Sequence, residues 1–213
     1  RLMNNQSVRA YPDLVTFAFF CRLQNMRSVS KTYASESMVR IGRGTILHIA
    51  PSNVPINFAY SAIAGLLSGN SNIVRLPTRE FPQVDLLLDE IHSLLLDKRY
   101  NFLAPYLTFV RYDKKNKKVT EILSLESAIR IIWGGDDTVR QVRRLDTHPK
   151  TFDITFPDRY SLCAFKASKV DENCLDEIVS NFYNDTYLFD QNACTSPHLI
   201  LWYGDDNEIE RAK

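Results

Sequence analysis

Cys194 lies in a run of small and polar residues, 189–197 (FDQNACTSP), between two apolar stretches. Residues 176–187 before it are typical of a helix and residues 198–203 after it of a strand, so the thiol is expected in a loop that a substrate can reach. A thiolate there could attack a carbonyl carbon and hold the acyl group as a thioester. Because an unpaired cysteine is more often a small buried apolar residue, Cys194 by itself does not establish an enzyme.

Asn53 follows an apolar run at residues 45–50 and precedes Pro55. An asparagine at that place commonly caps the helix that follows, and for Asn53 alone this is the stronger interpretation. Its carboxamide could instead donate a hydrogen bond to a carbonyl oxygen on which negative charge develops. The second role gains weight only when Asn53 is considered together with the Cys194 thiol.

Arg75 and the pair Gly134-Gly135 are candidates for nucleotide contacts. Arg75 lies at the end of a second apolar run, where its cation could meet a ribose or a 2′-phosphate, although a solvated arginine is equally expected there. Glycines before a helix let backbone N–H groups approach a pyrophosphate, but such a pair is more often a tight turn. The dinucleotide fingerprint GxGxxG is absent, since Gly42 and Gly44 precede an expected strand, and this disfavours a generic Rossmann dehydrogenase.

The elements around these candidates follow a regular alternation. From about residue 41, apolar runs alternate with amphipathic helical patterns. The expected strands are 45–50, 71–76, 106–112, 128–133, 161–165 and 198–203. The expected helices are 12–26, 56–68, 82–97, 119–125, 137–145 and 176–187.

This alternation predicts an α/β fold, a Rossmann-like parallel sheet with helices on both faces. Ligands bind at the carboxyl ends of such strands, which places the loops 51–55, 76–80 and 133–137 at one edge of the sheet. His48, inside the first expected strand, is expected in the core.

Composition limits the possible functions. The 213 residues carry a net charge of +1 and are 45% hydrophobic, which is ordinary for a globular protein and argues against nucleic-acid binding. The four cysteines are scattered, so neither a metal site nor a disulfide framework is expected, and a cytoplasmic location is favoured. No apolar run is long enough to span a membrane. The chain has no initiator methionine and ends in a charged stretch, so we expect it to be a fragment.

Residues 48–55 (HIAPSNVP), 69–77 (GNSNIVRLP) and 133–136 (WGGD) together resemble the acyl-CoA reductase branch of the aldehyde dehydrogenase superfamily. The likeness is greatest to the LuxC-type fatty-acid reductases, whose catalytic-cysteine segment residues 190–197 (DQNACTSP) match. The resemblance covers about residues 40–203. It implies an aldehyde-dehydrogenase-like fold of which this chain lacks most of the catalytic domain.

The resemblance implies a role for each candidate residue. Cys194 would be the nucleophile that takes an acyl group from a thioester, and Asn53 with the Cys194 backbone N–H would form the oxyanion hole. Arg75 stands where the superfamily usually has a lysine near the adenosine ribose, and an arginine suits the 2′-phosphate of NADPH, with NADH as the alternative. The remaining predicted cofactor contacts are Pro51, Ser52, Gly134, Gly135 and Asp136, the last three where the superfamily has a Gly-Ser pair.

One departure from the superfamily bears on the reaction. Aldehyde dehydrogenases use a glutamate in a Glu-Leu-Gly-Gly segment to activate the water that hydrolyses the enzyme thioester. Residues 157–161 (PDRYS) contain no such segment and offer only Asp158, whose side chain is shorter. An acyl-cysteine without that base should last until hydride reduces it.

The resemblance therefore implies NAD(P)H-dependent reduction of a fatty acyl-CoA or acyl-protein thioester to an aldehyde. The alternatives are a CoA-acylating aldehyde dehydrogenase that runs oxidatively and an inactive nucleotide-binding remnant. An acyl-activating partner protein and a homo-oligomer are also implied. The expected division is an N-terminal helical segment (1–40), a nucleotide-binding domain (41–188) and the start of a truncated catalytic domain (189–213).

Overall fold

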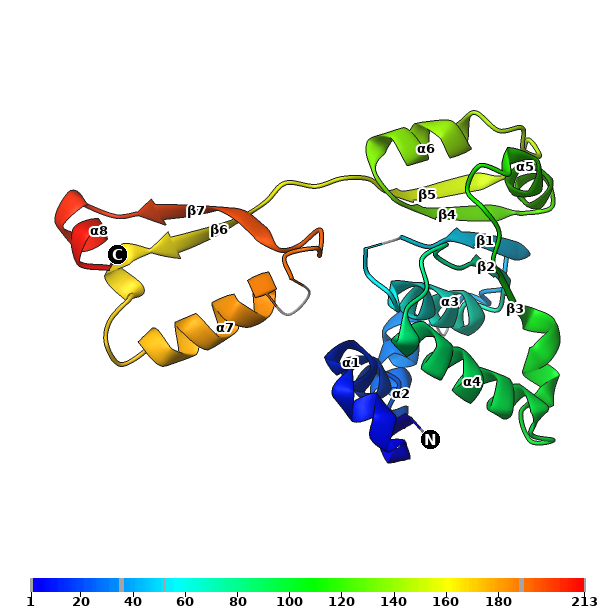
Figure 1. Cartoon of the computed structure of the whole chain (residues 1–213), viewed down its shortest axis with the longest axis horizontal. Helices are drawn as coiled ribbons and strands as arrows, with labels where there is room; N and C mark the ends of the chain where they lie inside the picture. The colour runs from blue at the N-terminus through cyan, green and yellow to red at the C-terminus, as the bar shows by residue number, and fades with distance from the viewer. Residues whose placement is uncertain (1, 35–36, 52, 188–189, 213) are drawn as a thin grey trace. The chain divides into compact units, whose positions relative to one another are not determined.

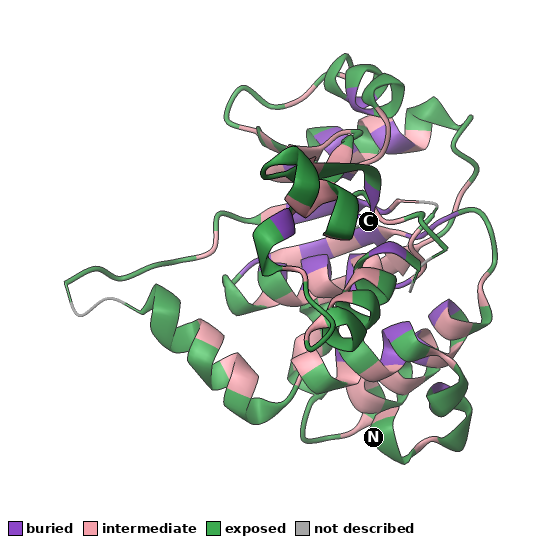
Figure 2. Cartoon of the chain, turned by 90° about the vertical axis from the view of Figure 1, so that its left-hand side faces the viewer, coloured by how far each residue is buried: buried purple, intermediate pink, exposed green. Residues whose placement is uncertain are grey.

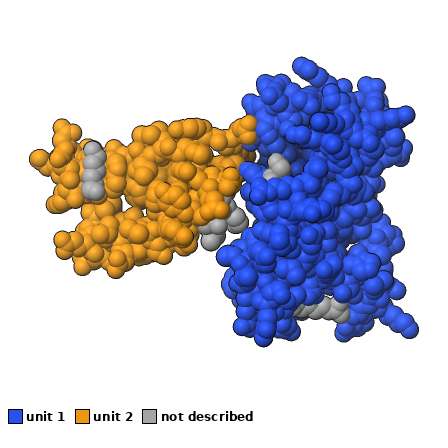
Figure 3. Space-filling model, viewed as in Figure 1, with its two compact units in different colours: residues 1–157 blue, residues 158–213 orange. Residues whose placement is uncertain are grey.

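The computed structural model describes residues 2–34, 37–51, 53–187 and 190–212. The chain forms two compact units, residues 1–157 and residues 158–213, which are coloured separately in Figure 3. The break between them follows Pro157, whereas the sequence led us to expect a functional boundary after residue 188. Which segments bind the cofactor and which catalyse stays a prediction.

The first unit is built on a five-stranded parallel sheet in the order β3-β2-β1-β4-β5 (Figure 1). Its strands are β1 (Thr45–Ile49), β2 (Ser71–Arg75), β3 (Leu107–Val110), β4 (Ile129–Trp133) and β5 (Phe152–Phe156). The parallel sheet and its first four strands confirm the prediction. In this order the connections change direction between β1 and β4, which is where doubly wound sheets bind ligands.

Helices cover both faces of this sheet (Figure 1). On one face lie α3 (Asn57–Leu67) and α4 (Pro82–Leu96), and on the other α5 (Lys117–Leu125) and α6 (Asp136–Arg143). Strand β1 serves both layers because its side chains alternate: Leu47 and Ile49 pack with α6, whereas His48 contacts α3. The buried residues accordingly concentrate in the sheet and in the helix faces turned towards it (Figure 2).

The N-terminal segment packs against the layer of α3 and α4. This segment contains η1 (Leu2–Asn4), η2 (Gln6–Ala10), α1 (Pro12–Phe20) and α2 (Leu23–Tyr33). Elsewhere in the unit, the short helix η3 (Asn101–Tyr106) joins α4 to β3. The prediction of one helix over residues 12–26 was wrong. Arg22 adopts an extended backbone (φ −62°, ψ 140°), which ends α1 and allows α2 to start in a new direction.

The second unit contains a separate two-stranded parallel sheet of β6 (Ser161–Lys166) and β7 (Pro197–Tyr203). Helix α7 (Leu175–Tyr187) packs on this sheet through the rings of Phe165 and Phe182, whose centroids are 6.1 Å apart. The short elements η4 (Ala167–Lys169) and α8 (Asp206–Ala212) complete the unit. Both strands and α7 were predicted, and α8 was not.

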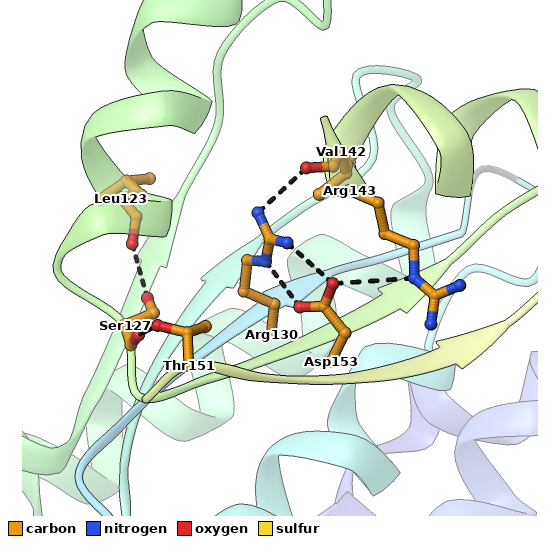
Figure 4. Close-up of polar contacts among 7 residues, drawn as sticks. All are labelled: Leu123, Ser127, Arg130, Val142, Arg143, Thr151 and Asp153. Carbon is orange, nitrogen blue, oxygen red and sulfur yellow. Dashed lines mark hydrogen bonds and ion pairs between the residues drawn. The ribbon is translucent and has the colours of Figure 1, made fainter. Parts of the chain in front are cut away.

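A buried ion pair joins the amino ends of β4 and β5 to α6 (Figure 4). The Arg130 guanidinium donates to both Asp153 carboxylate oxygens at 2.7 and 2.8 Å and to the Val142 carbonyl at 3.0 Å. The two charged side chains are only 3% and 17% exposed. This cluster lies at the edge opposite the predicted ligand loops, so its role is to hold the sheet together.

The part of the chain that the structure describes contains neither a membrane-spanning helix nor a cluster of metal ligands. No helix there is long and apolar enough to cross a membrane. No group of three or more His, Cys, Asp or Glu side chains there could hold a metal ion.

Candidate active site

The carboxyl ends of β1, β2 and β4 lie at one edge of the five-stranded sheet. In the parallel register Ile49 pairs with Arg75 on one side and with Ile132 on the other. The loops that follow these three strands therefore begin side by side. The structure thus places the predicted ligand loops together, while the roles of their residues stay predictions.

Asn53 lies exposed in the loop between β1 and α3, and Pro51 in the same loop is half-buried. Ser52, the third predicted residue of this loop, lies outside the described residues. Helix α3 begins at Asn57 and its N-cap is Ile56, without a side-chain capping bond. The capping role that the sequence favoured for Asn53 is therefore wrong.

Arg75, the last residue of β2, is half-buried rather than fully solvated. Its Cζ lies 4.9 Å from the centroid of the Tyr112 ring, and its Nη2 donates to the Tyr112 carbonyl oxygen at 3.5 Å. Its Nε is buried without a hydrogen-bond partner among the residues that the structure describes. The half-buried guanidinium as a whole remains a cation without a carboxylate partner among the described residues, so the side chain suits an anionic ligand.

Gly134 and Gly135 join β4 to α6. Gly134 has φ +157°, and a Cβ there would lie 3.0 Å from the Thr138 Cγ2, so a side chain is disfavoured. Gly135 is the N-cap of α6, whose first turn carries Asp136 and Asp137. These carboxylates favour the helix start but would repel a pyrophosphate. Of the predicted contacts here, the two glycines suit a phosphate better than Asp136.

Cys194 lies in a tight turn between α7 and β7, as the sequence predicted. The Ser196 N–H donates to the Ala193 carbonyl at 3.0 Å and closes the turn around Cys194. Immediately before it, Asp190 and Gln191 both have left-handed backbone conformations, with φ of 49° and 61°. Two successive non-glycine residues with positive φ are uncommon, and this conformation is strained. Strained residues of this kind are found often at functional sites.

Ser161, the first residue of β6, holds this turn in place. Its Oγ donates to the Cys194 carbonyl oxygen at 2.7 Å. Ser161 belongs to the segment 157–161, which lacks the superfamily's Glu-Leu-Gly-Gly glutamate, and Asp158 of that segment is exposed. The sequence did not identify Ser161 as a functional residue, because no local pattern connects it to Cys194.

The four cysteines differ in how available their thiols are. Cys194 is exposed, whereas the other three are half-buried. Burial raises the pKa of Cys21 to about 11 and also raises the pKa of Cys163, which keeps both thiols protonated at neutral pH. The Cys174 thiol donates to the Lys169 carbonyl at 3.3 Å. Cys194 is therefore the cysteine best placed to meet a substrate.

His48 is buried, as expected, and links the two strands that carry the candidate loops. Its Nδ1 lies 2.8 Å from the Ser61 hydroxyl and its Nε2 lies 2.8 Å from the Asn72 carboxamide oxygen. The Asn72 amide nitrogen donates to the backbone carbonyls of Asn70 and Tyr106. The ring therefore donates from Nε2 and accepts at Nδ1, a neutral tautomer that fixes β1 to α3 and β2.

The predicted site residues divide between the two units. Asn53, Arg75 and the glycines belong to the first unit, and Cys194 belongs to the second. The meeting of Asn53 and Cys194 at one carbonyl group stays a prediction. Tyr112 was missed from the sequence, because no local pattern connects it to Arg75, which lies 37 residues earlier.

Comparisons with known proteins agree with this fold. An aldehyde dehydrogenase structure from Burkholderia cenocepacia, described as putative, superposes with a TM-score of 0.70 at 17% identity, covering 97% of this chain and 44% of that one. A betaine aldehyde dehydrogenase from Staphylococcus aureus, solved in complex with NAD+, gives a TM-score of 0.58 at 16% identity, covering 80% and 32%. The aldehyde-dehydrogenase-like fold that the sequence predicted is confirmed, and the chain spans less than half the length of either structure.

Sequence comparison is more specific. A Vibrio harveyi protein, the long-chain acyl-protein thioester reductase, is 25% identical over 175 residues, which are 80% of this chain and 34% of that protein. The chain thus spans about a third of that relative's length. The model of the family described as acyl-CoA reductase (LuxC) matches residues 18–212. The chain belongs to the acyl-CoA reductase (LuxC) family.

Proposed function

We propose that the protein is an oxidoreductase that reduces an acyl thioester to an aldehyde through an acyl group held on Cys194. The observation that carries the proposal is the exposed Cys194 thiol, in a turn fixed by Ser161, within a chain of the acyl-CoA reductase family. The aldehyde-dehydrogenase-like fold supports the same class of chemistry.

The chemical step assigned to the chain is acyl transfer. The Cys194 thiolate attacks the thioester carbonyl, a new C–S bond forms, and the carrier thiol leaves as the original C–S bond breaks. The Asn53 carboxamide and the Cys194 backbone N–H donate to the oxyanion of the tetrahedral intermediate. A nicotinamide cofactor, when bound, supplies the hydride that releases the acyl group as an aldehyde.

The first unit supplies the groups for that cofactor. The half-buried Arg75 cation and the glycine turn at Gly134 lie at the carboxyl edge of the sheet, where nucleotides bind in folds of this kind. An arginine beside the ribose favours NADPH, because a 2′-phosphate gives its guanidinium a dianionic partner. NADH is the alternative. Pro51 borders the same edge.

The names of the relative and of the family support the carrier, and the partners are proposed from the family resemblance alone. The Vibrio harveyi protein is named for acyl-protein thioesters, and the family description names acyl-CoA. We propose that the substrate is a fatty acyl thioester of one of these carriers, that an acyl-activating protein delivers it, and that the enzyme is a cytoplasmic homo-oligomer.

The proposal is tested by mass spectrometry of the intact protein after incubation with hexadecanoyl-CoA. We expect a single acyl adduct in the wild type and in the control Cys174→Ala, and none in Cys194→Ala. Oxidation of added NADPH should accompany loss of the adduct. An adduct of equal yield in Cys194→Ala would refute the assignment. Net formation of acyl-CoA from aldehyde, with no detectable reverse reaction, would favour the oxidative alternative.

A further inference from the structure

Arg75 is half-buried, whereas Arg22, Arg43 and Arg79, which also lack a carboxylate partner in the described part of the chain, are exposed. Among the described residues, five arginines have a carboxylate within 4.0 Å, namely Arg99, Arg111, Arg130, Arg140 and Arg143. In the described part of the chain, Arg75 has no such partner, although it is half-buried. Two acidic side chains on nearby elements, Glu80 and Asp85, are both engaged by Arg111. Arg75 is thus a partly desolvated cation left open to an external anion.

Two contacts to Tyr112 hold Arg75, the hydrogen bond from its Nη2 to the backbone carbonyl and a contact with the aromatic ring. The guanidinium carbon lies 4.9 Å from the centre of the Tyr112 ring, within the range of a cation–π interaction. The ring is itself anchored, because the Tyr112 hydroxyl lies 3.0 Å from Thr120 Oγ1, a buried group on α5. A ring attracts the cation without neutralising it, so the charge stays available to a ligand.

We propose that Tyr112 is a positioning residue that fixes the Arg75 guanidinium and thereby sets the preference for NADPH over NADH. This inference rests on the proposed function, in which Arg75 meets the cofactor ribose. A guanidinium already held in one orientation loses little freedom when a 2′-phosphate binds, whereas a 2′-hydroxyl gains much less from that charge. Tyr112 should therefore affect the affinity for NADPH selectively.

The test is to measure dissociation constants for NADPH and NADH by fluorescence titration of the purified protein. Tyr112→Leu and Tyr112→Met remove the ring, and the methionine keeps most of the apolar volume in case the leucine variant does not fold. Tyr112→Phe keeps the ring and loses only the hydroxyl. Tyr100→Leu is the matched control, because Tyr100 also lies under an arginine, at 5.4 Å, but that arginine is already paired with Asp97.

We expect Tyr112→Leu and Tyr112→Met to raise the dissociation constant of NADPH about fivefold and to leave that of NADH within about twofold. Tyr112→Phe, which keeps the ring but loses its bond to Thr120, should weaken NADPH binding less than Tyr112→Leu does, and Tyr100→Leu should stay close to the wild type. If Tyr112→Leu and Tyr112→Met weaken the binding of both nucleotides equally, or of neither, the inference is overturned. In that case a wild-type preference for NADPH that depends on Arg75 still supports the cofactor assignment. A wild type that binds neither nucleotide overturns both.

Discussion

The Ser161 hydroxyl donates a hydrogen bond to the backbone carbonyl of Cys194 at 2.7 Å. The bond ties the first residue of β6 to the turn that presents the nucleophile, across 33 residues of sequence. It fixes the carbonyl group on the C-terminal side of the Cys194 Cα, while the N–H on the N-terminal side of that Cα is a predicted donor to the oxyanion. We therefore expect Ser161 to orient the thiol and that N–H through the turn.

Replacing Ser161 with alanine should slow acylation of Cys194 about fivefold, because one hydrogen bond that orients the turn is lost. Ser161→Thr, which keeps the hydroxyl, should restore most of the rate. The measurement is the single-turnover rate of adduct formation by quenched-flow mass spectrometry. Ser180→Ala, at an exposed position on α7, is the control. Equal rates for Ser161→Ala and the wild type would show that the bond does not position the nucleophile.

Asn53→Ala should lower the acylation rate about a hundredfold or more, the cost of removing one oxyanion donor. The dissociation constant of NADPH should stay unchanged, because the carboxamide is assigned to the acyl group. Asn184→Ala, exposed on α7, is the matched control. A parallel loss of NADPH affinity in Asn53→Ala would instead place this side chain in the cofactor site.

The buried His48 should make stability depend on pH. Loss of hydration on burial lowers its pKa from 6.5 to about 4, against the opposing effect of the hydrogen bond to Asn72. Between these pH values the unfolded chain binds a proton at His48 that the folded protein does not bind. The contribution of the neutral His48 to the free energy of unfolding is therefore complete above pH 6.5 and is lost as the pH falls towards 4. The loss amounts to about 3 kcal/mol at most.

The check is the free energy of unfolding, from urea titrations between pH 4 and pH 8. His48→Gln should be less stable at neutral pH, but its free energy of unfolding should depend less on pH between pH 4 and pH 6.5. The control His92→Gln, at an exposed position on α4, should leave the wild-type slope unchanged. A His48→Gln profile parallel to that of the wild type would contradict the assignment.

Breaking the buried ion pair should cost far more than breaking an exposed one. Asp153→Asn leaves the Arg130 guanidinium buried without its counter-ion and should destabilise the fold by about 3–5 kcal/mol. Asp137→Asn removes the exposed pair with Arg140, whose side chains are 86% and 62% exposed, and should change stability by less than about 1 kcal/mol. The shift of the urea unfolding midpoint measures the loss of stability in each variant. Similar shifts for Asp153→Asn and Asp137→Asn would exclude a structural role for the Arg130–Asp153 pair.

The sequence predicted the sheet well because its central strands are short, nearly continuous apolar runs. β1 and β4 are buried on both faces, and such runs are typical of parallel strands. β5 was missed because it lies at the edge, where Phe152 and Ile154 are exposed and the apolar run is interrupted. The break at Arg22 was missed because neither glycine nor proline marks it.

The candidate site was predictable only in part. Cys194 and Asn53 stand in local motifs, so their loops could be located from the sequence. Tyr112 and Ser161 could not be found in this way, because each acts through a contact with a residue 37 or 33 positions away. The failure of Asn53 as a cap depends on where α3 begins, and helix boundaries are the least certain part of a sequence-based prediction.

The most direct test of the central claim follows the fate of the acyl group on Cys194. The wild-type protein is loaded with hexadecanoyl-CoA, freed of excess thioester, and divided between buffer alone and buffer with NADPH. The adduct should persist in buffer, because residues 157–161 lack the Glu-Leu-Gly-Gly glutamate that activates water, and it should disappear as aldehyde when NADPH is added. Rapid release of free hexadecanoic acid in buffer alone would contradict the account.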